Sequence, residues 1–207
     1  MALSNYTELK STIADFLNRD DLTSIIPAFI ELAEAQMNRD IRHWRMETRS
    51  VGDVDSEYST LPSDWIETIS LHVNGDGTST LNLSSREAIA NRRAKTEDES
   101  GRPRLYSHAD GSIELFPTPD KTYEIELLYY AKLDVLSSSN ATNWLLDEAP
   151  DVYLYGALIH SAPYLQEDAR AGTWASMYSA AVQKLNAASK AAQMSGTGLR
   201  LNVRGLG

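Results

Sequence analysis

Apolar residues in the first forty-five positions recur at spacings of three and four, the period of an amphipathic helix. Asn5 followed by Glu8 is typical of a capping pair at a helix start. Pro27 lies where the first turn of a second helix tolerates proline, after a cap at Thr23 or Ser24. We therefore expect two helices, the second ending near Arg45. Their apolar faces are Tyr6, Leu9, Ile13, Phe16 and Leu17 in the first and Phe29, Ile30, Ala33, Met37, Ile41 and Trp44 in the second.

From residue 47 the period changes to two, which is typical of strands. Turn residues follow several of the alternating runs, at 74–77 and 109–111. The clearest strand is Tyr123–Ala131, which we expect at the centre of the sheet. We predict one meandering antiparallel sheet, with a short polar helix from Ser84 or Ser85 to about Lys95. The predicted strands are 48–54, 58–61, 66–73, 81–83, 104–107, 112–116 and Tyr123–Ala131.

Helices return after a Ser/Asn-rich link at 137–142. Acidic residues and Pro150 predict a helix start, and we expect that helix to run to about Leu165. A turn at 166–168 then leads into a last helix with an alanine-rich stripe about 100° wide. The stripe is Trp174, Met177, Tyr178, Ala181, Leu185, Ala188 and Ala192.

These elements predict an α+β fold. We expect a four-helix bundle formed by the N- and C-terminal helix pairs, a central antiparallel β-rich insertion and an extended C-terminal tail. The predicted domains are 1–46, the N-terminal helix pair; 47–136, the β-rich insertion; 137–195, the C-terminal helix pair; and 196–207, the tail.

The chain has 207 residues, a net charge of −10 and no cysteine. Its apolar runs are far shorter than the roughly 20 residues that a membrane-spanning helix needs, so we expect no membrane anchor. Without a basic region followed by an apolar core at the start, we also expect no secretory signal. Disulfides and cysteine-based zinc sites are excluded. The acidic balance argues against a protein that grips nucleic acid by neutralising phosphates.

Residue patterns for catalysis or metal binding are missing from the sequence. No two histidines have a spacing that places two ligands on one helix face. The acidic run at 53–64 imitates a calcium loop, but Tyr58 stands where that loop needs glycine. Neither a nucleophile elbow, a phosphate loop nor a complete dinucleotide fingerprint occurs. We therefore predict no catalytic, cofactor-binding or metal-binding residue, no cofactor and no enzyme activity. The histidines are His43, His72, His108 and His160.

Two basic clusters remain as candidate contact sites. In the first, arginines recur at three and four around Trp44, where they could meet phosphates or acidic partners. Basic residues also suit a helix C-terminus without any partner. The second cluster is interrupted by the acidic residues at 97–99. A loop of mixed charge like this is usually just solvated, but such loops also form the rims of protein contacts. The first cluster is Arg39, Arg42, Arg45 and Arg49, and the second is Arg92, Arg93, Lys95, Arg102 and Arg104.

The last residues alternate apolar with polar side chains, although a short terminal segment is most often disordered. A purely solvating tail has little reason to alternate in this way, whereas a segment that adds a strand to a partner's sheet needs the alternation. We expect the tail to dock on a partner. The alternating residues are Leu199, Arg200, Leu201, Asn202, Val203 and Arg204.

The order of several short motifs resembles the head-to-tail adaptor (connector) proteins of tailed bacteriophages, of the tail tubular protein A type. None of the motifs is catalytic, so the resemblance depends on their joint order along most of the chain. They are Tyr-Thr-Glu-Leu at 6–9, Ala-Gln-Met-Asn-Arg-Asp-Ile-Arg at 35–42, Leu-Pro-Ser-Asp-Trp at 61–65, Tyr-Tyr-Ala at 129–131, Thr-Asn-Trp-Leu-Leu at 142–146, Pro-Asp-Val-Tyr-Leu-Tyr-Gly-Ala-Leu at 150–158 and Ala-Pro-Tyr-Leu at 162–165.

The resemblance implies a structural virion protein at the head-tail junction, made in the host cytoplasm. Its implied partners are the portal protein, a tail or nozzle protein, further copies of itself in a dodecameric ring, and DNA that passes through the channel without specific binding. Residues 199–204 would bind the portal, and an acidic lining would let DNA slide. The first helix or the Arg39–Arg49 stretch would form part of the subunit contact.

Two other classes of function stay open from the residues alone. Trp65, Tyr106 and Tyr58 are compatible with a glycan- or peptide-binding module on the β-rich insertion, although aromatic residues are more often core or sheet pairs. The many acidic residues are compatible with an unrecognised carboxylate hydrolase, since two nearby carboxylates can do acid/base work.

Overall fold

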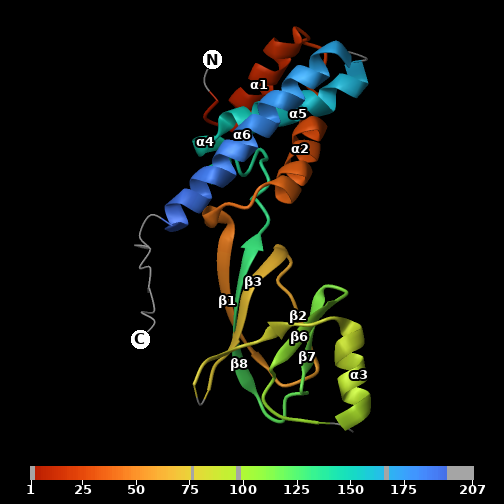
Figure 1. Cartoon of the computed structure of the whole chain (residues 1–207). Coiled ribbons are helices and arrows are strands. Elements are labelled where there is room, and N and C mark those ends of the chain that lie inside the picture. The colour runs from red at the N-terminus through yellow and green to blue at the C-terminus, as the bar shows by residue number, and fades with distance from the viewer. Residues whose placement is uncertain (1–2, 76, 97–98, 166–167, 195–207) are drawn as a thin grey trace, which may run out of the picture. The chain divides into compact units, whose positions relative to one another are not determined.

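The computed structural model describes residues 3–75, 77–96, 99–165 and 168–194. Its contacts divide the chain into a helical unit, Met1–Arg45 with Leu133–Gly207, and a β unit, Met46–Lys132. Figure 1 shows the helices of the first unit and the strands of the second. The fold is α+β, as predicted. The four-helix bundle and the limits of the four predicted domains remain predictions.

Helix α1, Tyr6–Leu17, begins at the predicted cap. The Glu8 backbone N–H donates to Asn5 Oδ1 at 3.0 Å, while the Glu8 carboxylate accepts from the Ser4 N–H and hydroxyl. This is the reciprocal arrangement of a capping box, with Ser4 supplying the returning donors. The predicted apolar face is buried except for Phe16, which is 43% exposed.

Helix α2, Ile26–Asp40, departs from the prediction at both ends. Its cap residue is Ile25, whose side chain makes no capping bond, and Thr23 instead donates to the Asp20 carbonyl. The helix ends at Asp40, because Ile41 adopts an extended backbone, and a short 3-10 helix follows at Trp44–Met46. The expected end near Arg45 was therefore wrong.

Two helices follow the link in place of the one predicted there: α4, Trp144–Glu148, and α5, Pro150–Leu165. Helix α5 packs against α1, α2, α4 and α6, which makes it the centre of the helical unit. Close approach depends on Gly156, since a Cβ there would lie 3.1 Å from Met37 Cε and 3.2 Å from Ala33 Cβ.

Helix α6, Asp168–Met194, buries only part of the predicted stripe, namely Trp174, Tyr178 and Leu185. Met177 is 45% exposed and Ala188 is exposed, while Val182 and Ser189 are buried. The buried positions follow spacings of four, four, three and four, which gives a narrower seam than the predicted face. They are Trp174, Tyr178, Val182, Leu185 and Ser189.

A buried polar network joins α2 to the segment that returns from the β unit. Glu34, only 3% exposed, accepts from the Tyr153 hydroxyl at 3.0 Å and from the Leu136 N–H at 2.8 Å. Asn143 caps α4 and donates to the Tyr153 hydroxyl and to the Asp134 carbonyl. The network therefore holds the link onto the helices.

The β unit contains two four-stranded sheets, so the predicted single meander was wrong. One sheet has the order β1-β8-β3-β4 and the other the order β2-β7-β6-β5, in which β5 and β6 are parallel. The long strand β8 lies between β1 and β3, as predicted. The strands are β1 Glu47–Val54, β2 Tyr58–Thr60, β3 Trp65–Val73, β4 Ser79–Thr80, β5 Asn82–Leu83, β6 Leu105–Ala109, β7 Ser112–Phe116 and β8 Tyr123–Ala131.

Helix α3, Arg86–Thr96, connects β5 to β6 across the second sheet and packs on β6, close to its predicted position (Figure 1). The hairpin from β6 to β7 turns at Asp110 and Gly111, which both have positive φ, as expected for the predicted turn. A cluster of buried apolar residues between Val54 and Ala131 draws on strands of both sheets. Helix α3 contributes a fully buried residue of its own, Ile89.

Candidate functional site

The predicted arginine cluster is divided between the two units. Arg39 at the end of α2 is exposed, and Arg42 Nη1 donates to the carbonyls of Asn38 at 3.0 Å and Ile41 at 2.7 Å. Arg45 Nε lies 3.0 Å from Glu148 Oε2, with its guanidinium over the Trp44 ring. These contacts are within the helical unit.

Arg49 belongs to the β unit, on strand β1. Its guanidinium binds Glu126 of β8 through two bonds of 2.7 Å, which lowers the pKa of that carboxyl group. A role for the four arginines in a subunit contact remains a prediction. The predicted portal-binding residues 199–204 lie outside the described residues, so that assignment also remains a prediction.

Two arginines of the second basic cluster point into the β unit. Arg93 of α3 lies between Glu57 at 3.1 Å and Glu114 at 3.2 Å and also donates to Thr118. Glu114 is buried and also accepts from the Ser107 hydroxyl. Arg102 donates to the carbonyls of Val73 and Gly77. These two arginines are part of the fold and do not form the accessible site.

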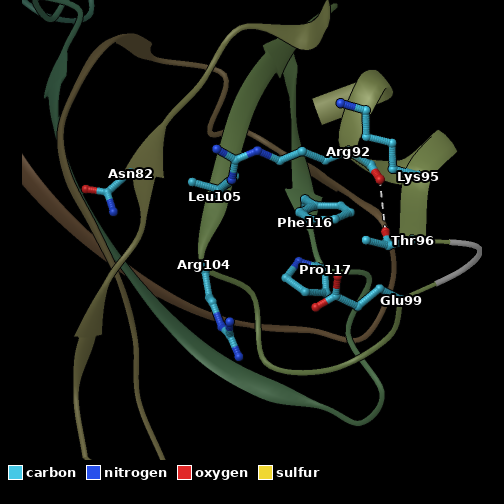
Figure 2. Close-up of a pocket in the computed structure, with 9 residues that line it drawn as sticks. All are labelled: Asn82, Arg92, Lys95, Thr96, Glu99, Arg104, Leu105, Phe116 and Pro117. Atoms are coloured by element: carbon cyan, nitrogen blue, oxygen red, sulfur yellow. Dashed lines mark hydrogen bonds between the residues drawn. The ribbon is translucent and has the colours of Figure 1, made fainter. Parts of the chain in front are cut away.

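The other three basic residues lie around one pocket of about 390 Å³ beside α3. Figure 2 shows Phe116 and Pro117 at its centre, with Arg92 extending from α3 toward Leu105 and Arg104 on the other side. Phe116 is the last residue of β7 and Pro117 follows it, and the Arg104 N–H donates to the Phe116 carbonyl. The lining residues are Asn82, Arg92, Lys95, Thr96, Glu99, Arg104, Leu105, Phe116 and Pro117.

Three basic side chains, Arg92, Lys95 and Arg104, give the pocket its positive charge. Within the described ranges, the side chains of Arg92, Lys95 and Arg104 take part in no ion pair. Glu99, at the rim, is the one anionic residue among the nine that line the pocket. Cations around an apolar floor can bind an anionic group that is attached to an apolar one.

Comparison with protein families gives a match to the model of the SU10 adaptor protein over residues 4–201. The chain belongs to the SU10 adaptor protein family. The match covers nearly the whole chain, both units included. It supports the resemblance to bacteriophage adaptors but does not distinguish the tail tubular protein A type. A comparison with curated proteins gave no match.

The histidines of this SU10 adaptor family member are held in separate surroundings. His43 stacks on Trp144 with ring centroids 4.9 Å apart, and burial lowers its pKa. His108 packs between Trp65 and Tyr106, where burial lowers its pKa too. In the part of the chain that the structure describes, no group of three or more metal-ligating side chains comes together.

Acidic residues of the run at 53–64, which imitates a calcium loop, make contacts within the fold of this family member. Glu57 pairs with Arg93, and Asp64 accepts from the Tyr129 hydroxyl.

Among the described helices none is both long and apolar enough to cross a membrane. From the sequence, the basic residues of the pocket could be identified only as a loop of mixed charge. The pocket itself could not be predicted, because its apolar floor includes Phe116, which belongs to a separate strand, β7.

Proposed function

We propose that this protein is a structural head-to-tail adaptor of a tailed-bacteriophage virion. The observation that carries the proposal is membership of the SU10 adaptor family over residues 4–201. The two units suit a scaffold role, because each is a compact unit of its own. The chain enters the β unit on β1 and leaves it on β8, and these two strands are paired. We assign no catalytic step, cofactor or metal to it.

In this proposal twelve copies form a ring between the portal and a tail or nozzle protein. The helical units form the ring wall, and the β units are offered to the tail. One heterologous contact, repeated by the ring symmetry, joins neighbouring copies. The Arg39–Arg49 stretch supplies part of that contact, and residues 199–204 add a strand to the portal.

The strong negative charge of the chain supports a passive wall for the DNA channel. A net charge of −10 repels phosphates, so DNA would pass without being held. The protein would then be found in the virion at the head-tail junction, after synthesis in the host cytoplasm.

The proposal is tested by native mass measurement of the purified protein, alone and mixed with the portal ring encoded near it. Full-length protein and a version that ends at Ser195 are compared. We expect stoichiometric loading of the portal by the full-length protein and its loss on truncation. Loading by both versions would keep the adaptor role and remove the tail assignment. No loading by either would contradict the adaptor role.

The subunit contact needs a variant that leaves the fold intact. Reversal of Arg42 would also break its bonds to the backbone carbonyls at the end of α2, so Arg39→Glu is the cleaner change. We expect R39E to reduce ring assembly on the portal with only a small drop in the melting temperature, from the lost cation at the end of α2. Lys184→Glu, on an exposed lysine of the same unit outside the stretch, is the matched control. Normal assembly of R39E would refute a role for Arg39 in the contact.

A further inference from the structure

We infer that the pocket beside α3 is a docking site for an acidic segment of a partner protein that carries an apolar or aromatic residue next to its carboxylates. This inference goes beyond the adaptor role, because it rests on the chemistry of the pocket alone. It assigns a function to Arg92 and Arg104 and to the apolar floor formed by Phe116 and Pro117.

The three cations of the pocket have no ion-pair partner among the described residues. Elsewhere in the described chain, Arg19, Arg45, Arg49 and Arg93 lie within about 3 Å of a carboxylate oxygen. For Arg92, Lys95 and Arg104 the structure shows no such carboxylate within the ranges it describes. The helix dipole favours a cation such as Lys95 in the last turn of α3. It does not explain Arg104, which lies outside the helix, just before β6.

Charge is unevenly distributed along the β unit. Residues 46–132 contain nine basic and sixteen acidic residues, and six of the nine basic ones lie between 86 and 104. The acidic residues dominate elsewhere: on the outer face of the first sheet, Asp53 of β1 is directly opposite Glu124 of β8. Opposed like charges are destabilising across strands. The pocket is therefore a basic site on an acidic unit, which steers an acidic partner to it.

The shape and lining of the pocket favour a protein partner over a nucleic acid. Duplex DNA is bound through many phosphates along a basic track, whereas here the cations surround one concavity of about 390 Å³ with a proline and a phenylalanine at its base. Phe116 is only 6% exposed, so it offers a floor and not a ring on which bases stack. An apolar side chain with adjacent carboxylates fits this combination.

Both walls of the pocket are held in place before any partner arrives. Arg93 anchors α3 through Glu57, Glu114 and Thr118. On the opposite wall, Arg104 is held at the backbone by bonds with Phe116 and Asn82. A preformed site loses less conformational entropy on binding, which favours recognition of a short segment.

The test measures binding of the full-length chain to a fluorescent peptide that contains several glutamates around one phenylalanine. We expect saturable binding by fluorescence anisotropy. Arg92→Glu and Arg104→Glu should each lower the affinity about tenfold or more, because each replaces an attraction by a repulsion. Lys121→Glu is the matched control, since it makes the same charge change on an exposed lysine of the same unit outside the pocket. A peptide with glutamine in place of glutamate should not bind.

Several results would overturn the inference. These are no binding by the unaltered protein, equal binding of the glutamine peptide, or a loss in K121E as large as in R92E and R104E. Displacement of the peptide by a short DNA duplex at lower concentration would assign the pocket to nucleic acid instead. Unchanged melting temperatures show that the variants fold. The assay contains no portal, so its outcome is independent of ring assembly.

Discussion

Glu34 is the most deeply buried carboxylate among the described residues of the helical unit, and burial raises its pKa above the ordinary value of 4.5. For an acid with a raised folded-state pKa, the stabilising contribution is complete below the unfolded pKa and is lost as the pH rises through the folded one. Unfolding measured from pH 4.5 upward should therefore show Glu34→Gln gaining stability relative to the unaltered protein, with a plateau once Glu34 is ionised.

The same position distinguishes charge from hydrogen bonding. Glutamine can still accept from the Tyr153 hydroxyl and the Leu136 N–H, whereas Glu34→Ala leaves both donors buried without that acceptor. A buried unsatisfied donor costs about 1–3 kcal/mol. We expect E34A to lose about 3 kcal/mol in denaturant unfolding at pH 7. A loss of similar size in E34Q would show that the charged form itself is required.

Gly156 allows α5 to lie close to α2, because its side chain is a single hydrogen atom. A methyl group there would lie 3.2 Å from Ala33 Cβ, which is fixed on α2 and cannot move aside. Overpacking typically costs about 1–3 kcal/mol, against a gain of up to about 1 kcal/mol in helix propensity. Calorimetry should show Gly156→Ala lowering the melting temperature. Gly172→Ala in α6, where a Cβ meets nothing within 4 Å, should raise it slightly.

At the scale of elements, the ion pairs of Arg93 decide whether α3 stays on its sheet. Arg93→Met removes the nearer of two cations from buried Glu114 and leaves Arg86 at 4.0 Å, so we expect a loss below the about 3–5 kcal/mol typical of breaking a fully buried pair. Hydrogen exchange should show the α3 amides losing protection first. Arg92→Met, which breaks no pair, is the control. The double change R93M with Glu114→Leu should recover only part of the loss, because it removes the buried charge but also leaves the buried Ser107 hydroxyl without its acceptor.

The elements also show what the sequence can and cannot predict. The capping of α1 and the central place of β8 were predictable, because each depends on residues within one segment. The single meander was wrong because the pairing of β1 with β8 and the parallel pair β5 and β6 join strands far apart in sequence. The pocket escaped prediction for the same reason: Arg92 and Arg104 flank Phe116 only once α3 packs on its sheet.

At the scale of the whole molecule, the β unit interrupts the helical unit through two adjacent strands. Glu47 at the start of β1 is directly opposite Tyr130 near the end of β8, so the two points where the chain enters and leaves the unit lie side by side. The core of the β unit is formed by its own residues, from Val54 to Ala131. We therefore expect residues 46–132 to fold without the rest of the chain.

Deletion of the β unit tests whether the helical unit also folds on its own. Because paired residues in neighbouring strands lie about 5 Å apart, a short Gly/Ser linker from Arg45 to Leu133 can replace the whole insertion. Circular dichroism should show cooperative unfolding for this shortened chain and, separately, for the 46–132 fragment. Two cooperative fragments would support the β unit as a module that the family can vary without altering the helices. A fragment that unfolds without cooperativity would mean that its core depends on the helical unit for stability.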